Sequence, residues 1–331
     1  MSIIYKILMF ILLFQILVVG FSTKTDAEEN FETWLLSYKK FALKQGISQE
    51  TIDIAFKNVK FLDQVIRYDR KQPEFFEDTK TYVDKRANIS RVKTARKLLK
   101  ENQILFTKVE NKFSVEKEIL LALWGIETNF GKHVGKMDII SSLATLSYDK
   151  RRRDFFSSQL LTLLNLIDEK LINPDTLYGS WAGAYGNFQF MPSTIKFYAI
   201  DYDNNNKIEL KSSLDDSLAS AANYINKIGW KKGQPCFFRV KLTNNIKDKY
   251  INSSARTISN RLKIKKWKKK GIINWDGTDL TTNLKAALIL PDGKPDTPAF
   301  LVFENYEKIL KWNRSLRFGI SVCTLANMIK I

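Results

Sequence analysis

The chain has 331 residues, of which 44% are hydrophobic and 12% aromatic, and these proportions exclude a disordered chain. Its formal net charge of +18 at pH 7 implies a polyanionic partner or surface, although a Lys-rich genome would produce the same excess. A single histidine, His133, excludes a His-rich zinc site and is expected in a loop without a chemical role.

The first 27 residues have the order of a secretory signal peptide. Lys6 supplies a positive charge, residues 7–21 are almost wholly apolar, and Ala27 ends a small-residue cleavage site. An uncleaved membrane anchor is the alternative, but the apolar run is shorter than the roughly 20 residues that span a bilayer. We therefore expect an exported protein that begins near Glu28, and export argues against nucleic acid as its partner.

The rest of the chain is predicted to be mainly helical. Apolar side chains from residue 28 to 102 recur at the three-to-four spacing of amphipathic helices. The first such group is Phe31, Trp34, Leu35 and Tyr38. Further helices are expected at 91–99, 119–124, 155–166, 218–228 and 315–328.

The helix over 119–124 is expected to be buried because its side chains are apolar nearly all round. Ser114 is predicted to cap its start, and Glu116 and Glu118 would place negative charge in its first turn. Glu127 follows Trp124 by three residues and shares the apolar stripe. Burial would raise the pKa of its carboxyl group, as a general acid requires. An ion pair between Glu127 and a basic residue at the helix end is the alternative.

Loops and strands separate these helices. Residues 178–191 contain three glycines, which predict a tightly turning loop that a ligand can approach closely. Residues 236–275 are basic and irregular, and the run 263–270 is expected to be a solvated face. Short strands are predicted at 286–290 and 299–303.

Only two cysteines occur, Cys236 and Cys323, and their spacing matches no metal site. Export permits a disulfide bond between them, and two buried free thiols are the alternative.

Five motifs carry a family resemblance. They are Trp124-Gly-Ile-Glu-Thr-Asn-Phe-Gly131, Ser142-Leu-Ala-Thr-Leu-Ser147, Gly179-Ser-Trp-Ala-Gly-Ala-Tyr-Gly-Asn-Phe-Gln-Phe-Met-Pro-Ser193, Ala219-Ser-Ala-Ala-Asn-Tyr224 and Lys311-Trp-Asn-Arg-Ser315. In this order they resemble the lytic murein transglycosylases of the B family, which are membrane-bound lytic transglycosylase B-like proteins of the lysozyme-like superfamily. The resemblance is weak over residues 236–285.

The resemblance implies an α+β, mainly helical fold with a lysozyme-like catalytic domain. The expected divisions are a signal peptide (1–27), an N-terminal helical region (28–102), the lysozyme-like core (103–235), a basic irregular segment with a small β element (236–298) and a C-terminal segment that completes the groove (299–331). The implied activity is cleavage of peptidoglycan glycan strands, with a 1,6-anhydromuramic end, by a periplasmic and monomeric protein. A muramidase that uses water and a non-catalytic peptidoglycan-binding protein are the alternatives.

The resemblance also implies roles for individual residues. Glu127 would protonate the glycosidic oxygen and then activate the sugar's own 6-hydroxyl. Substrate-binding positions implied in the same way are Ser180, Gln189, Tyr224, Trp312, Asn313 and, from the N-terminal region, Tyr82. Ordinary core packing is the alternative for Tyr224 and Trp312, and Trp312 stands where relatives often have Tyr.

A second catalytic carboxylate is not identifiable in the sequence. Glycosidases of the usual kind use two carboxyl groups. Asp138, Asp149 and Asp154 are available, but none matches a catalytic position of the family. A single-acid mechanism is therefore expected, in which the substrate's own hydroxyl attacks and gains from proximity.

A calcium loop is expected at residues 201–209, and the chemistry itself requires no cofactor. Oxygen ligands stand at its positions 1, 3, 5 and 9, which are Asp201, Asp203, Asn205 and Glu209, and Lys207 offers its carbonyl at position 7. The family resemblance implies a calcium loop here with a later acidic ligand, which Asp216 resembles. Asn206 replaces the usual Gly at position 6 but tolerates a left-handed conformation. An Asx-rich surface turn without a metal is the alternative.

Overall fold

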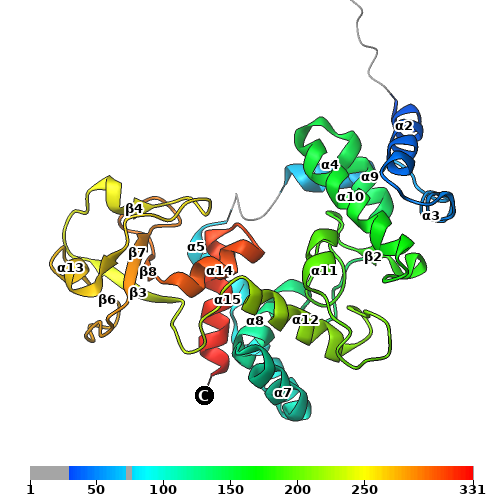
Figure 1. Cartoon of the computed structure of the whole chain (residues 1–331). Coiled ribbons are helices and arrows are strands. Elements are labelled where there is room, and N and C mark those ends of the chain that lie inside the picture. The colour runs from blue at the N-terminus through cyan, green and yellow to red at the C-terminus, as the bar shows by residue number, and fades with distance from the viewer. Residues whose placement is uncertain (1–29, 72–76, 331) are drawn as a thin grey trace, which may run out of the picture.

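The structure is a computed structural model that describes residues 30–71 and 77–330, so the expected signal peptide lies outside the described residues. The fold is α+β and mainly helical, as predicted, with a small mixed sheet beside the helices (Figure 1). Within the two described ranges, no helix combines the length and the apolar character needed to cross a membrane.

The described residues between 30 and 102 are mainly helical, as predicted. Their helices are α2 (Phe31–Lys44), α3 (Gln49–Ala55), α4 (Asp63–Arg70), α5 (Thr79–Arg86) and α6 (Ile89–Glu101), and α7 (Gln103–Phe113) follows. The side chains of Asn30, Ser48, Asp78 and Asn88 cap α2, α3, α5 and α6 by accepting from backbone N–H groups. The predicted apolar group of α2 is buried, and Phe31 packs edge-on against Tyr148 at 5.6 Å.

The helix that carries Glu127 is α8 (Lys117–Thr128), and its residues 119–125 are buried, as predicted. The prediction that Ser114 caps it was wrong. Ser114 instead ends α7 in a left-handed conformation (φ 53°), and Glu116 is the residue that precedes α8. Because only three residues separate the two helices, the chain has to reverse within them, and the first of the three takes the helix-ending conformation.

The remaining helices surround α8. They are α9 (Ile139–Tyr148), α10 (Arg153–Asp168), α11 (Pro192–Tyr198), α12 (Leu214–Lys227), α14 (Glu304–Trp312) and α15 (Leu316–Ile329). Short 3₁₀ turns occur at Lys150–Arg152, Pro174–Thr176 and Asp248–Tyr250, and a two-stranded ladder joins β1 (Met137–Asp138) to β2 (Tyr178–Gly179). The apolar α15 packs along α8, so the catalytic-helix candidate lies inside the helical core.

The sheet lies to one side of the C-terminal helices (Figure 1). Its elements are β3 (Phe237–Leu242), β4 (Ile251–Asn252), β5 (Leu262–Lys263), β6 (Ile272–Asn274), β7 (Lys285–Ile289) and β8 (Ala299–Val302), with α13 (Ile264–Lys268). The strand order is β4-β7-β8-β3-β6, and β5 also pairs with β7. All these pairs are antiparallel except β4 with β7.

The two predicted strands correspond to β7 and β8, whereas β3 to β6 were not predicted from the sequence. These strands are short and pair with partners distant in the chain, so their local pattern gave no signal. The basic run is only partly solvated. Lys265 and Lys266 are exposed, but Ile264 and Trp267 are buried in a second apolar core beneath the sheet.

Of the two alternatives for the cysteines, the structure has the disulfide bond. Cys236 and Cys323 are joined, with their Cα atoms 6.1 Å apart. The bond connects the residue before β3 to the middle of α15. It therefore ties the sheet to the helix that packs along α8.

Candidate active site

Glu127 lies in the last turn of α8 and is half-buried. The indole Nε1–H of Trp312 donates a hydrogen bond of 2.9 Å to its Oε1. Trp312 is the last residue of α14, so the fold joins two positions 185 residues apart. The guanidinium of Arg91 donates to the carbonyl of Gly125 at 3.1 Å, which attaches α6 to the same end of α8.

Glu127 opens onto a cleft of about 830 Å³. The residues along this cleft are Tyr68, Lys71, Glu127, Ser180, Trp181, Ala182, Ala184, Gln189, Ser253, Ala255, Pro291, Trp312, Asn313, Arg314, Ser315, Leu316 and Arg317. Among these described residues Glu127 carries the only carboxyl group, and Lys71, Arg314 and Arg317 carry positive charge. A cleft with this cationic lining attracts ligands that carry carboxylates.

Ser180 begins a tight turn at the edge of the cleft. Its Oγ accepts from the backbone N–H groups of Ala182 (3.2 Å) and Ala184 (2.9 Å), and its own N–H donates to the carbonyl of Ala184. The hydroxyl hydrogen remains available to donate to a ligand. Gly179 is required beside it, because a Cβ there would lie 2.1 Å from the carbonyl oxygen of Ala184.

Gln189 lies on the same loop in a left-handed conformation (φ 51°). Its Nε2 donates to the carbonyls of Val134 (3.2 Å) and Gly186 (2.9 Å), so both amide hydrogens serve to hold the loop. Its Oε1 is the atom that can accept a hydrogen bond from a ligand.

Asn187 fixes this loop against α8 and was not predicted from the sequence. Its Oδ1 accepts from Trp124 Nε1 at 3.2 Å, and its carbonyl accepts from Thr128 Oγ1 at 2.8 Å. Its Nδ2 reaches the carbonyl of Lys211 and the hydroxyl of Ser217. Asn187 is buried. Its partners lie on three separate segments that are distant in the chain, so the spacing of residues in the sequence could not reveal these contacts.

Trp312 and Asn313 both line the cleft, whereas Tyr224 lies behind Trp312. The rings of Tyr224 and Trp312 are 5.1 Å apart and tilted by 31°, and Tyr224 Oη donates to the carbonyl of Lys311 at 3.1 Å. Burial raises the pKa of Tyr224 to about 12. Tyr224 thus supports the wall of the cleft from within the protein.

Tyr82 lies on α5 and is buried beneath the guanidinium of Arg86, which stacks 3.4 Å from the ring centre. It is not among the described residues that line the cleft. The N-terminal region contributes Tyr68 and Lys71 instead, and neither was predicted.

Asp69 fixes the end of α4, where Tyr68 lies and which Lys71 follows. Its buried carboxylate pairs with Arg151 and Arg152 in the 3₁₀ turn before α10. Burial alone would raise the pKa of Asp69, but hydrogen bonds and charge from the two guanidinium groups outweigh it and hold the pKa below its usual value.

The other three aspartates considered from the sequence lie away from the cleft wall. Asp138 caps α9 by accepting from Ser141 N–H, and Asp149 pairs with Arg70. Asp154 lies in the exposed first turn of α10, and His133 is exposed in the turn after α8. None of these four side chains is among the described residues that line the cleft with Glu127.

Residues 30–327 match the protein family described as "Transglycosylase SLT domain". The chain belongs to this transglycosylase family. It is 38% identical over 144 residues to membrane-bound lytic murein transglycosylase B of Escherichia coli, and this match covers 42% of the chain and 40% of that relative. The aligned region thus spans less than half the length of the relative.

Solved structures of SLT transglycosylases share the fold. Pseudomonas aeruginosa SltB3 is 34% identical, with 91% of this chain and 80% of that one covered and a TM-score of 0.83; it was crystallised with NAG-NAM-pentapeptide and with NAG-anhNAM-pentapeptide. E. coli Slt35 in complex with calcium is 26% identical, with 89% and 92% covered and a TM-score of 0.75.

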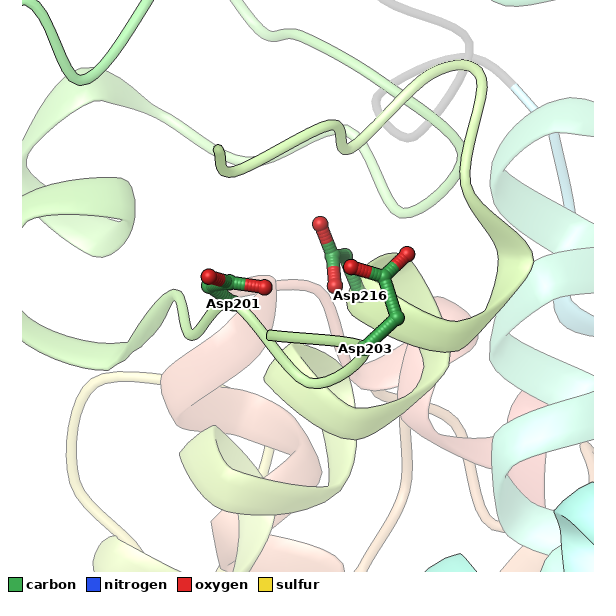
Figure 2. Close-up of side chains that lie close together, drawn as sticks. All are labelled: Asp201, Asp203 and Asp216. Atoms are coloured by element: carbon green, nitrogen blue, oxygen red, sulfur yellow. The ribbon is translucent and has the colours of Figure 1, made fainter. Parts of the chain in front are cut away.

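The transglycosylase chain also has an acidic cluster where the calcium loop was predicted. One carboxylate oxygen from each of Asp201, Asp203 and Asp216 lies within 4.8 Å of the other two, and the three groups converge in Figure 2. The backbone N–H groups of Asn205 and Asn206 donate to Asp201, which closes the loop, and Asn206 is left-handed (φ 65°).

Asp216 is the buried carboxylate of this cluster. Its two oxygens accept from the backbone of Tyr202 and Glu209. Burial, followed by the nearby charge of Asp203, raises its pKa. Such a group of hard oxygen ligands with unbalanced negative charge fits Ca²⁺.

Proposed function

We propose that this chain is a peptidoglycan lytic transglycosylase that cleaves the β-1,4 bond between N-acetylmuramic acid and N-acetylglucosamine. The observation that carries the proposal is the position of Glu127, the only carboxyl group among the described residues of a cleft of about 830 Å³. The family of the chain and the muropeptide ligands crystallised with SltB3 support it.

The first step is protonation of the glycosidic oxygen by Glu127. As the bond to the anomeric carbon breaks, positive charge develops on the muramic sugar ring. The N-acetyl oxygen of the substrate can stabilise this charge, since no second carboxylate stands among the described cleft residues. Ser180 would donate to the substrate, Gln189 would accept from it, and Asn313 would bind along the groove.

The second step uses the Glu127 carboxylate as a base. It removes the proton of the sugar's 6-hydroxyl, whose oxygen then bonds to the anomeric carbon and closes a 1,6-anhydro ring. The attacking hydroxyl belongs to the same sugar, so its effective concentration is very large. Glu127 ends protonated, ready for the next bond.

Product analysis separates this reaction from that of a muramidase, which is the second candidate with the same Glu127. Digestion of purified sacculi should give muropeptides lighter than hydrolysed ones by one water. Digestion in ¹⁸O-labelled water should leave the new muramic end unlabelled. Label in the main product would show that water attacks and would refute the transglycosylase reaction.

Glu127→Gln tests whether the chain is an enzyme or only a binding protein. Trp312 can still donate to the amide oxygen, so fold and sacculus binding should be kept, while strand cleavage falls by at least about 10²–10⁴-fold. Asp154→Asn is the matched control, because it removes an exposed carboxylate outside the cleft. Near-normal turnover of Glu127→Gln would exclude Glu127 as the acid.

Calcium would have a structural role in this enzyme. Asp201, Asp203, Asn205, the carbonyl of Lys207 and Asp216 would hold the ion. The loop joins α11 to α12, and Asn187 of the Gly-rich loop donates to the carbonyl of Lys211 just beyond it. Calcium would thus support the substrate-binding loop from behind.

We also propose that the protein acts as a monomer in the periplasm after cleavage near Glu28. The order of charge, apolar run and small residue in 1–27 supports export. N-terminal sequencing of native protein should start close to Glu28. Recovery of the intact N-terminus in a membrane pellet would favour the anchor.

A further inference from the structure

We propose that Trp312 is a positioning residue for the acid, with an indole N–H that fixes which oxygen of Glu127 carries the reactive proton. This inference rests on the proposed role of Glu127 and goes beyond a groove-lining role for the ring. The observation is the 2.9 Å hydrogen bond from Trp312 Nε1 to Glu127 Oε1.

The direction of this bond has a chemical consequence. An indole N–H can only donate, whereas a hydroxyl or an amide can donate or accept. Oε1 of Glu127 must therefore stay an acceptor in both protonation states. When the carboxyl group is protonated, its hydrogen is confined to Oε2, and the acid keeps one orientation through the catalytic cycle.

Packed rings hold the indole in place for this role. The ring of Tyr224 packs against that of Trp312 at 5.1 Å with a tilt of 31°, and Phe190 and Phe188 meet Trp312 edge-on at 5.3 and 6.2 Å. Tyr224 is itself tied to the carbonyl of Lys311, one residue before Trp312. The donor is thus presented by a rigid aromatic group, which lowers the entropy cost of holding the carboxyl group.

The bond also favours the charged carboxylate, because a donor to a carboxylate stabilises its ionised form. The cations on the surrounding elements are Arg91 of α6, Arg317 of α15, and Lys71 and Arg314 of the cleft. The acidic groups nearby are already in ion pairs: Asp292 with Arg317, and Glu304 and Glu307 of α14 with Lys231 and Arg261. Tyr68 is the phenol that lines the same cleft. Since all these groups remain when the indole is removed, a change in the titration of Glu127 can be assigned to the lost donor.

Kinetics of Trp312→Phe test the proposal. This variant keeps an aromatic ring but loses the donor, so kcat should fall about 10–100-fold, the range expected for a hydrogen bond to a charged group. KM should change little. The alkaline limb of the pH profile, which reports loss of the acid proton, should move to higher pH by about one unit.

Trp181→Phe is the matched control, since Trp181 lines the same cleft and undergoes the same chemical change. It is expected to alter KM without moving the alkaline limb. A Trp312→Phe enzyme with raised KM, unchanged kcat and an unmoved limb would overturn the proposal and leave Trp312 as a sugar platform.

A spectroscopic measurement separates this inference from the proposed function. In ¹⁵N-labelled protein, the indole resonance that disappears in Trp312→Phe belongs to Trp312. It should shift with pH as Glu127 titrates, and this shift should vanish in Glu127→Gln. The titration is measured without substrate, so it holds even if the reaction is assigned wrongly. An indole resonance that does not respond to pH between 3 and 9 would refute the coupling.

Discussion

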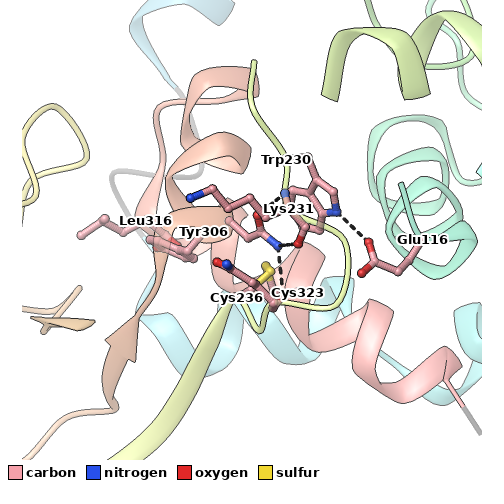
Figure 3. The surroundings of a disulfide bond; sticks show 9 residues. Glu116, Trp230, Lys231, Cys236, Tyr306, Leu316 and Cys323 are labelled. Carbon is pink, nitrogen blue, oxygen red and sulfur yellow. Dashed lines mark hydrogen bonds between the residues drawn. A yellow bond between two sulfur atoms is a disulfide. The ribbon is translucent and has the colours of Figure 1, made fainter. Parts of the chain in front are cut away.

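The disulfide between Cys236 and Cys323 offers a quantitative prediction. Figure 3 shows the bond beside the hydrogen bond from Trp230 to Glu116, at the junction of the sheet with the helical core. Its two cysteines are 87 residues apart. In the chain-entropy account, closing a loop of this length removes about 4.5 kcal/mol of denatured-state entropy at 25 °C.

This free energy translates into a melting temperature. An unfolding entropy of about 2.1 cal/mol/K per residue, over roughly 300 residues, gives about 0.6 kcal/mol/K. Reduction should therefore lower Tm by about 7 °C. Cleavage of sacculi at 25 °C should persist, because Glu127 and Trp312 are joined independently of the bond.

Calorimetry of oxidised and reduced wild-type protein measures the difference. The double variant Cys236→Ala/Cys323→Ala is the control, since its Tm should be low and indifferent to reductant. Equal Tm values for oxidised and reduced wild-type protein would refute the argument. A thiol titration that finds two free cysteines in native protein would contradict the bond itself.

Two further predictions concern the loops around the cleft. Calcium at a hundredfold excess over Kd should stabilise the fold by roughly 2.7 kcal/mol and raise Tm relative to protein in chelator. This rise in Tm should disappear in Asp203→Asn. An identical rise in Tm in that variant would exclude this site. Gly186→Ala should cost clearly more than about 1 kcal/mol in urea unfolding, because φ is +77° and the new Cβ would lie 2.4 Å from the carbonyl oxygen of Leu210. Gly233→Ala, also at positive φ but with nothing within 4 Å, isolates the backbone cost, and equal losses in both variants would show that the close contact is relieved.

Local patterns predicted the helices well and the sheet poorly. Burial of α8 could be read from consecutive apolar residues, because a helix forms from neighbours in the chain. In contrast, β3 pairs with β8, and the paired residues Phe237 and Val302 are more than sixty residues apart in the chain. The local spacing of side chains does not indicate such a pairing. The prediction for Ser114 was wrong for a related reason. A serine between two helices can end the first helix or start the second, and the packing of the two helices decides which of these it does.

The candidate site divides in the same way. Glu127, Ser180 and Gln189 could be chosen because they stand within contiguous motifs, and the structure places all three along one cleft. Tyr68 and Lys71 stand in no such motif, and the ion pairs of Asp69 with the distant Arg151 and Arg152 help to hold their segment at the cleft. The hydrogen bond from Trp312 depends on how α14 ends against α8, which a spacing of 185 residues does not reveal.

The position of Glu127 at the end of a helix explains why distant residues matter to it. The last carbonyls of a helix have no intrahelical partner, so the final turn frays unless other groups bind them. In α8 the carbonyl of Gly125 accepts from the C-cap N–H of Asn129 and also from Arg91, and the carbonyl of Thr128 accepts from the backbone N–H of His133. The Thr128 hydroxyl in turn donates to Asn187 of the Gly-rich loop. These contacts join the end of α8 to α6 on one side and to the Gly-rich loop on the other, so the carboxyl group that we propose as the acid is held from both sides.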